Sequence, residues 1–482
     1  MWYITVYAPH VKTVPVTDME KGKLRKKLIG DKRFYRMMLG IAIPIMVQNG
    51  ISNFVGLLDN LMIGRVGTNE LSGVAIANQL MFVHYLLIFG ATAGVGIFTV
   101  QFYGAGDTEG VRISFRFKLL ANTLLSAVSI TLFLLFSEPL TRLFLQGEGS
   151  PEDAAETLRI GISYMRIMLV GLIPIGITNA YAGTLRDTGQ TRVPMFASVA
   201  AIFVNLIGNA ILIYGLFGLP AMGAVGAAFA TVISRFVELA VLVIYTSTHS
   251  KEHPFITGAF THFRIPLRLA GRFIVRSIPL VANETLWALG ITVMNQCYSF
   301  RSLDAVAALN IENTLWNLMG VCFIAMGEAV GIIVGQALGS GDIPKAKDHA
   351  AKLITFTVAC GVFFGLLMCI VGPYFPQLYK TSAEVRLLAS QLIIVYGVLM
   401  PLYALTHAAY FTIRAGGNTL ITFLFDCCFV WAVSVPAAYT ISRLTSIDVL
   451  PMVIIVQSLE VIKCVIALWM VKSGIWAKKI SR

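Results

Sequence analysis

The sequence predicts an all-α polytopic membrane protein whose twelve transmembrane helices form two pseudo-symmetric lobes of six helices each. Its 482 residues are 57% hydrophobic and only 13% charged, and the mean hydropathy is +0.77, which leaves too little polar surface for a water-soluble protein of this size. Apolar runs long enough to cross a bilayer as a helix, about 20 residues, recur along the chain. A motif that occurs once in each half indicates that the halves are copies of one unit.

The repeated motif reads GIFTVQFYGAGD at residues 96–107 and GIIVGQALGSGD at residues 331–342. Gly, Ile, Gln, Gly, Gly and Asp recur at an offset of 235 positions, and Pro44 aligns with Pro279 at the same offset. An even number of crossings per half gives both halves the same orientation, so we expect a parallel repeat about an axis along the membrane normal. Each Gly-rich turn is expected to end a helix with glycine in the left-handed conformation, since the Lys-Ser/Thr of a phosphate-binding loop is missing.

Residues 1–36 form a tail in which lysine and arginine cluster from Lys21 to Arg36. Such a cluster next to a first span holds that end of the chain in the cytoplasm. The opening residues lack the apolar region and cleavage site of a signal peptide, so we expect the first span to direct insertion. The N-lobe is predicted at residues 37–247, with spans at residues 37–63, 71–102, 115–136, 158–183, 193–217 and 222–247.

A polar stretch at residues 248–271 is predicted to link the two lobes in the cytoplasm. The C-lobe is predicted at residues 273–472, with spans at residues 273–299, 306–338, 350–371, 387–413, 419–441 and 449–472. Residues 473–482 form a second cytoplasmic tail. This topology leaves most of the 37 lysine and arginine residues on the cytoplasmic side, as expected for a multi-pass protein of the cell (inner) membrane.

Several other classes of protein are disfavoured. The net charge of +12 does not indicate a nucleic-acid partner, because the basic residues lie between apolar spans and do not form a patch beside aromatic or polar readers. The seven cysteines lie in or near apolar runs without CxxC spacing, so we interpret them as core residues and expect neither a disulfide framework nor a metal site. An integral membrane enzyme is disfavoured because HExxH, GxSxG and paired-histidine motifs are missing.

Three features together resemble the multidrug and toxic compound extrusion (MATE) family. They are the duplicated GIxxxQxxGxGD motif, the segment IPIMVQNGISNFVGLLDNLMIG at residues 43–64 and the segment LRDTGQTRVP at residues 185–194. The resemblance extends from about residue 34 to residue 472. It implies export of amphipathic, often cationic compounds, coupled to an inward flow of protons or sodium.

Asp59 is the first candidate for ion coupling. It lies well inside the first span, where a charge costs about 2.5 to 3.5 kcal/mol on insertion scales, and the helix-1 aspartate of the MATE family falls at this position. In the fifth span Asn205 and Asn209 are four residues apart and therefore share a helix face. The family has an acid at the second of these positions, so coupling through Asn209 is in doubt, and polar coordination of an ion or substrate remains. Tyr164 and Thr231 match polar positions of the same lobe.

The predicted spans of the C-lobe contain more acidic residues than those of the N-lobe. Glu284 in the seventh span is the second candidate, one turn from the usual place of a functional glutamate in the family, and a bound Na⁺ is expected near Asp59 or Glu284 if sodium is the coupling ion. Glu312 and Glu328 in the eighth span replace alanines of the first half. His407 in the tenth span is interpreted as a packing residue.

Other polar residues of the spans are interpreted as structural. We expect Arg235 to pair with Glu238, and Lys463 with Glu460, because each pair is three residues apart on a helix. Asp426 has no obvious partner. His84 is interpreted as a packing residue, and Trp287, Trp316 and Tyr298 are candidates for lining a cavity that holds flat cations. Pro44 and Pro279 each remove a helix hydrogen bond and are hinge candidates.

The leading functional hypothesis is a secondary antiporter that exports amphipathic, cationic compounds in exchange for H⁺ or Na⁺ by alternating access. Such a protein would need no cofactor, would contact membrane lipids and small substrates, and is expected to act as a monomer. The alternative is a flippase or exporter for lipid-linked or other metabolites with the same two-lobe build. That function would favour a basic cavity.

Overall fold

The computed structural model describes residues 28–145, 150–261 and 263–481. Within these ranges, twelve helical stretches are long and apolar enough to cross a membrane, which confirms the predicted fold class. Most of the basic cluster of the N-terminal tail lies outside the described residues, but the first helix already begins at Lys32.

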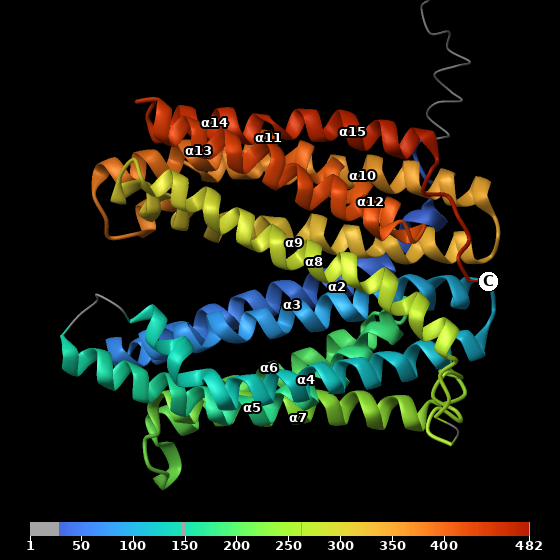
Figure 1. Ribbon diagram of the computed structural model, residues 1–482, viewed down its shortest axis with the longest axis horizontal. Helices are drawn as coiled ribbons and strands as arrows, with labels where there is room; N and C mark the ends of the chain where they lie inside the picture. Colours follow the sequence, from blue (N-terminus) through green and yellow to red (C-terminus); the bar gives the residue numbers. More distant parts are fainter. Residues whose placement is uncertain (1–27, 146–149, 262, 482) are drawn as a thin grey trace, which may run out of the picture.

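The first half of the chain forms one layer of helices, drawn from blue to green in Figure 1. Its elements are α2 (Lys32–Gly64), α3 (Thr68–Gly104), α4 (Thr108–Phe144), α5 (Pro151–Asp187), α6 (Arg192–Tyr214), the short 3₁₀ turn η1 (Leu216–Gly218) and α7 (Gly223–Thr248).

The second half forms the other layer, drawn from yellow to red in Figure 1. Its first four spans are α8 (Leu267–Ser299), α9 (Leu303–Gly339), α10 (Ile343–Val371) and α11 (Ala383–Ala415), with the 3₁₀ turn η2 (Phe375–Leu378) between α10 and α11. The fifth span consists of α12 (Thr419–Phe423), the π-helical turns η3 (Leu424–Cys428) and η4 (Val430–Ser434), and α13 (Val435–Leu444). The sixth span consists of α14 (Val449–Ser458) and α15 (Glu460–Ser473).

Every predicted span coincides with one of these helical stretches. The main difference is at the start of α8, which begins at Leu267, inside the segment expected to be a linker. Pro266 precedes the first turn with extended backbone angles. Proline is tolerated there because the first helical N–H groups have no partner within the helix. The connection between the halves therefore covers residues 249–266.

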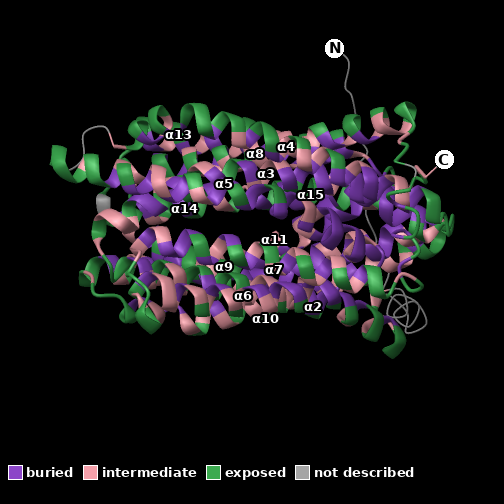
Figure 2. Cartoon of the chain, turned by 90° about the horizontal axis from the view of Figure 1, so that it is seen from below, coloured by how far each residue is buried: buried purple, intermediate pink, exposed green. Residues whose placement is uncertain are grey.

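The two layers converge towards one end of the molecule, which we call the closed end. It carries the Gly-rich turns at residues 105–107 and 340–342, and it is the right-hand end in Figure 1, where the C-terminus lies. The loops at residues 65–67 and 300–302 lie at the opposite, open end. Buried residues are packed most densely towards the closed end in Figure 2.

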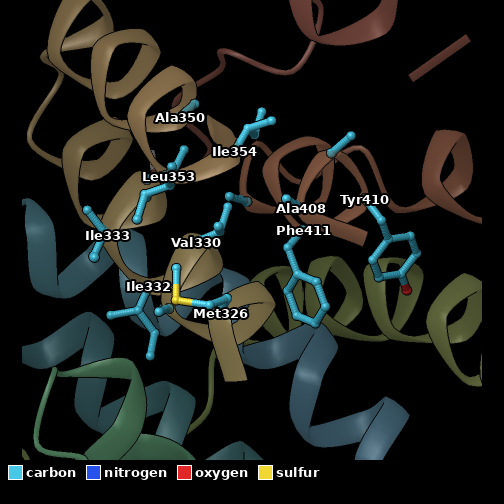
Figure 3. Close-up of a cluster of buried hydrophobic side chains, with 14 of the residues drawn as sticks. Met326, Val330, Ile332, Ile333, Ala350, Leu353, Ile354, Ala408, Tyr410 and Phe411 are labelled. Carbon is cyan, nitrogen blue, oxygen red and sulfur yellow. The ribbon is translucent and has the colours of Figure 1, made fainter. Parts of the chain in front are cut away.

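The first helix of each half packs into the core of the other half. Met38, Ile41 and Ile45 of α2 join a core cluster that is built mainly from the C-lobe helices α9, α10 and α11, part of which is shown in Figure 3. Conversely, Phe273 of α8 joins a cluster of the N-lobe and contacts Phe98 of α3 edge-on, with ring centroids 5.0 Å apart. Both contacts use the halves of α2 and α8 nearest the closed end.

Candidate functional site

Four polar residues of the N-lobe form a hydrogen-bonded chain between α2, α6 and α7, which we call the Asp59 cluster. Asn209 Nδ2 donates to Asp59 Oδ1 at 2.6 Å and to Asn205 Oδ1 at 3.3 Å. Asn205 Nδ2 donates to Thr231 Oγ1 at 3.1 Å. Four candidates selected from the sequence are thus brought together in the half of the lobe nearest the open end.

The Asp59 cluster offers oxygen atoms that nothing else in the described chain uses. Asn205 and Asn209 are 6% and 0% exposed, and Asn209 Oδ1 has no hydrogen-bond partner among the described residues. The charge of Arg235 acts on Asp59, but this guanidinium is bound to Glu238 at 2.9 Å. A carboxylate beside an unsatisfied amide oxygen can accept a proton or help to coordinate a hard cation.

A second network of the N-lobe lies nearer the closed end. Gln48 Nε2 donates to Ser198 Oγ at 2.7 Å, and Ser198 Oγ donates to Glu238 Oε1 at 2.5 Å. The second carboxylate oxygen of Glu238 accepts from Arg235, which confirms the predicted pair. This network joins α2, α6 and α7 and satisfies a buried acid with one cation and one hydroxyl.

The C-lobe network differs from the prediction. Lys463 Nζ lies 2.7 Å from Asp426 Oδ1, while Glu460 accepts a hydrogen bond from Thr406 Oγ1 at 2.6 Å. The predicted pairing of Lys463 with Glu460 was therefore wrong, and Asp426 has a partner. Asn283 Nδ2 donates to the other oxygen of Asp426 at 3.1 Å. Spacing along one helix did not reveal these partners, because they come from neighbouring helices.

These two networks occupy equivalent places in the repeat. The offset of 235 relates Gln48 of α2 to Asn283 of α8. A second offset of 228, which relates the segment LRDTGQT at residues 185–191 to IRAGGNT at residues 413–419, also relates Ser198 to Asp426 and Arg235 to Lys463. We call the two arrangements the inner networks. Applied together to the sequence, the two offsets could have identified Gln48, Ser198 and Asn283, which were missed.

The other acidic candidates of the C-lobe lie apart from the Asp59 cluster. Glu284 is half-buried beside the C-lobe inner network, and the charges of Arg414 and Asp426 act on it. Glu312 is only 4% exposed, and its Oε1 has no hydrogen-bond partner among the described residues. Neither carboxylate is within 4.0 Å of a basic group in the part of the chain that the structure describes.

Glu328 contacts the opposite lobe. Its carboxylate lies 3.5 Å from Arg186 of α5, across a pocket between the lobes at the closed end. Asp187, next along α5, lies 2.6 Å from the fully buried Lys118 of α4. Arg414 of α11 also lines this pocket. The sequence placed Glu328 among the coupling candidates, and the structure places it in a contact between the lobes.

The glutamines of the repeated GIxxxQxxGxGD motif form a contact between the lobes at the closed end, which we call the glutamine lock. Gln101 Nε2 of α3 donates to the carbonyl oxygen of Ala415 at 2.9 Å, and Gln336 Nε2 of α9 donates to that of Asp187 at 3.2 Å. A Cβ atom at Gly104 would overlap the carbonyl oxygen of Gln336, and one at Gly339 would overlap that of Gln101. The motif therefore lets α3 and α9 approach closely and join across the lobes.

The remaining motif positions shape the turns. Gly106 and Gly341 have φ values of +74° and +87°, as predicted for the ends of these helices. Asp107 and Asp342 accept hydrogen bonds from backbone N–H groups of the following helices, which caps those helices. No phosphate site is needed to explain the motif.

The lobes are joined further by the C-terminal segment after α15, the red chain segment that descends to the label C in Figure 1. The backbone N–H of Ile480 donates to Gln101 Oε1 at 2.7 Å, and Gln101 Nε2 also lies 3.3 Å from the carbonyl oxygen of Lys478. Gln101 therefore holds the C-terminal segment as well as the end of α11.

Pro44 and Pro279 lie in the closed-end halves of α2 and α8, and each helix continues through its proline. Pro44 has no N–H to donate to the carbonyl of Gly40, and Thr191 Oγ1 donates to that carbonyl instead at 3.3 Å. Both prolines lie where the first helix of a lobe crosses to the other lobe, which is a suitable position for a hinge.

The remaining candidates have packing partners. Tyr164 is buried and donates to Asn78 Oδ1 at 3.5 Å rather than to the Asp59 cluster. His84 Nδ1 lies 2.9 Å from Ser129 Oγ, and His407 packs between the rings of Phe323 and Phe411.

The three aromatic candidates have different surroundings. Tyr298 accepts from Gln457 Nε2 at 3.3 Å within the C-lobe, and Trp316 packs edge-on against Tyr396 and Tyr403, whereas Trp287 is 42% exposed. Among the residues with described positions, no group of three or more His, Cys, Asp or Glu side chains is placed to hold a metal ion.

Comparison with known proteins agrees with this architecture. The family model MatE matches residues 44–211 and 279–440, once in each lobe. The chain is 23% identical over 419 residues to the probable multidrug resistance protein YoeA of Bacillus subtilis, covering 86% of this chain and 89% of that protein. It is 23% identical over 447 residues to the probable multidrug resistance protein NorM of Thermotoga maritima, covering 92% and 93%.

The fold is also that of solved structures. A structure described as the outward-facing conformation of a multidrug resistance MATE family transporter superposes with a TM-score of 0.77 at 19% identity, covering 93% of this chain and 98% of that one. The match of the family model to both lobes shows that the chain belongs to the MatE family, the multidrug and toxic compound extrusion transporters.

Proposed function

We propose that this transporter is a secondary antiporter of the cell membrane that exports amphipathic, cationic compounds in exchange for protons or Na⁺. The observation that carries the proposal is the Asp59 cluster, a carboxylate with unsatisfied oxygen neighbours inside a membrane lobe. An ionisable group in such a place is costly and marks an ion or substrate pathway. The names of the related proteins YoeA and NorM, both probable multidrug resistance proteins, support the substrate class.

The orientation of the transporter in the membrane follows from its charge distribution. Basic residues flank the spans mostly on the side of the closed end, which we therefore assign to the cytoplasm together with both termini. The described conformation is then the one open to the outside. Return to the state open to the cytoplasm requires the glutamine lock and the Arg186 and Glu328 contact to break.

Coupling follows if ion and substrate compete for one lobe conformation. A proton or Na⁺ entering from the open end reaches Asp59, neutralises it, and favours release of the cationic substrate outward. The ion then leaves Asp59 when the closed end opens to the cytoplasm. Glu284, nearer the middle of its span, is the second site at which such an exchange can occur. One polypeptide contains both lobes, so the unit of transport is a monomer.

A flippase or exporter for anionic, lipid-linked compounds is the second candidate. The observation that favours it is Arg414, which lines the pocket between the lobes and has no acidic group within 4.0 Å among the described residues. Against it, the other basic residue that lines this pocket, Arg186, is paired with Glu328, and the lining residue Asp187 is paired with Lys118.

The test is efflux of the fluorescent cation ethidium from proteoliposomes under an imposed pH gradient or an imposed Na⁺ gradient. Wild type and Asp59→Asn are compared with Glu384→Gln, a control in which an exposed acid at the open end loses its charge. We expect one gradient to drive efflux by wild type and by Glu384→Gln, and Asp59→Asn to lose it. Efflux that neither gradient drives would contradict antiport and favour the flippase.

A further inference from the structure

Three arginines follow one face of α8 at the closed end. Arg268, Arg272 and Arg276 are spaced by four residues and so lie above one another on the helix. They line an open pocket that is completed by Phe98 of α3 and Ile480 of the C-terminal segment. Residues of both lobes and of the C-terminal segment therefore line the pocket.

Among the residues that the structure describes, only the middle arginine has side-chain partners. Arg272 donates to the carbonyl oxygen of Ile480, and its guanidinium lies over the ring of Phe98, 5.3 Å from the centroid. Within the described ranges, the guanidinium groups of Arg268 and Arg276 make no hydrogen bond and no salt bridge. Their charges act unfavourably on Arg272. Three like charges with no acid within 4.0 Å in the described part of the chain favour an anion as a partner.

The position of the pocket relative to the membrane selects the kind of anion. A helix of 33 residues is about 50 Å long, whereas the hydrocarbon core is about 30 Å thick, so the first turns of α8 reach the headgroup region. Beside the arginines, Ile274, Val275 and Ile278 are 47%, 65% and 61% exposed. An apolar surface directly next to a basic pocket matches a molecule with a charged head and hydrocarbon chains.

We propose that this pocket binds the phosphate of an anionic phospholipid, with Arg268 and Arg276 as its ligands and the acyl chains along the exposed apolar side of α8. Basic pockets between helices at a membrane surface are suited to such headgroups. Bidentate guanidinium contacts to phosphate oxygens supply the specificity.

The bound lipid would also stabilise the closed end. Phe98 belongs to the N-lobe, Arg272 to the C-lobe, and Ile480 is bound in turn to Gln101 of the glutamine lock. An anion bound by Arg268 and Arg276 offsets the repulsion that these two charges exert on Arg272 along α8, and so favours the position in which Arg272 contacts Phe98 and Ile480. The lipid therefore favours the conformation with the lobes joined at this end, because a ligand shifts an equilibrium towards the state that it binds better.

The test is native mass spectrometry of the purified full-length protein titrated with phosphatidylglycerol or with phosphatidylcholine of the same acyl chains. We expect one phosphatidylglycerol to bind wild type at least about tenfold more tightly than phosphatidylcholine, at roughly 1 kcal/mol for each basic residue engaged. The double variant Arg268→Gln/Arg276→Gln should lose this preference, and Arg268→Lys/Arg276→Lys should keep only part of it, because lysine keeps the charge and loses the bidentate contact. The matched control is Arg192→Gln, which removes an exposed arginine at the closed end of α6. This variant should bind both lipids as wild type does.

A melting experiment shows whether the glutamine variant is folded. In phosphatidylcholine its melting temperature should equal that of wild type, and added phosphatidylglycerol should raise the melting temperature of wild type only. Equal binding of the two lipids by wild type would overturn the proposal, as would an unchanged preference in the glutamine variant. Displacement of phosphatidylglycerol by equimolar inorganic phosphate would overturn the assignment to a lipid and identify a site for free anions.

Discussion

The inner networks are present in both lobes, whereas the Asp59 cluster has no polar counterpart in the second lobe. The offset of 235 relates Asp59 to Met294, and the offset of 228 relates Asn205, Asn209 and Thr231 to Val433, Ala437 and Leu459. The second half thus keeps the polar network near the closed end and has apolar side chains at the positions of the Asp59 cluster, while its own polar contacts nearer the open end join Gln457 to Tyr298, Tyr396 and Tyr403. Glu284 and Glu312, which have no basic group within 4.0 Å among the described residues, lie at other positions of this lobe.

The inner networks also differ in where the acid comes from. In the N-lobe, Glu238 lies on the same helix as Arg235 and reaches α6 through a serine hydroxyl. In the C-lobe the acid is Asp426, in the π-helical turn η3, which faces Lys463 directly. Wider π turns often mark positions with a special role in a helix. The inner networks are thus a feature that the two lobes share, whereas the Asp59 cluster is specific to the N-lobe.

The largest effect on stability is expected from breaking the C-lobe pair. Asp426→Asn leaves Lys463, with 9% of its side chain exposed, without a carboxylate, and an unpaired buried charge costs about 3–5 kcal/mol. The N-lobe change Glu238→Gln should cost less, because the side chain of Arg235 is 41% exposed. Thermal unfolding in detergent measures both. Recovery of most of the loss in Asp426→Asn/Lys463→Met would confirm the cause, and a larger loss in the N-lobe would contradict the comparison.

The close approach of α3 and α9 gives the next largest effect. Gly104→Ala and Gly339→Ala place a methyl group against a carbonyl oxygen of the opposite lobe, so each should cost about 1–3 kcal/mol and favour separation of the closed end. Gly40→Ala is the control, because a Cβ atom there meets nothing within 4 Å. Melting temperature and the distance between spin labels on the two Gly-rich turns report the result. Equal behaviour of all three variants would show that the contact is not tight.

The glutamine lock is expected to be uneven. Gln101 makes three bonds, to the backbone of Ala415, Lys478 and Ile480, whereas Gln336 makes one, to Asp187. At about 1 kcal/mol for each hydrogen bond, Gln101→Leu should cost roughly 2–3 kcal/mol and Gln336→Leu about 1 kcal/mol. Protease cleavage of the C-terminal segment should increase in Gln101→Leu alone, and equal cleavage in both variants would contradict this difference.

The smallest predicted effect concerns the two prolines. Thr191 donates to the carbonyl that Pro44 leaves free, whereas the equivalent Thr419 has no partner for its hydroxyl among the described residues. Thr191→Val should therefore cost about 1 kcal/mol, and Thr419→Val should be close to neutral. Thermal unfolding of the two variants checks this, with the reverse order as the contradicting outcome.

The spans and the two lobes could be predicted because hydropathy and an even repeat constrain a membrane protein strongly. The Asp59 cluster could be predicted in part, because Asn205 and Asn209 share a helix face and a buried aspartate needs polar neighbours. The pairing of Lys463 could not, since Asp426 approaches from a neighbouring span. The role of Glu328 was missed for the same reason, because its partner Arg186 belongs to the other lobe.

The central claim is that ion coupling depends on Asp59, which belongs to a polar cluster of the N-lobe whose equivalent positions in the C-lobe are apolar. The most direct measurement compares Asp59→Asn and Glu284→Gln in proteoliposomes, for ethidium efflux driven by an ion gradient and for ethidium exchange without any gradient. The account predicts that Asp59→Asn keeps ethidium exchange but loses gradient-driven efflux. Glu284→Gln should keep exchange and retain more of the gradient-driven efflux than Asp59→Asn does. If Asp59→Asn is driven as well as wild type and Glu284→Gln is not, the coupling acid belongs to the C-lobe and the account is wrong.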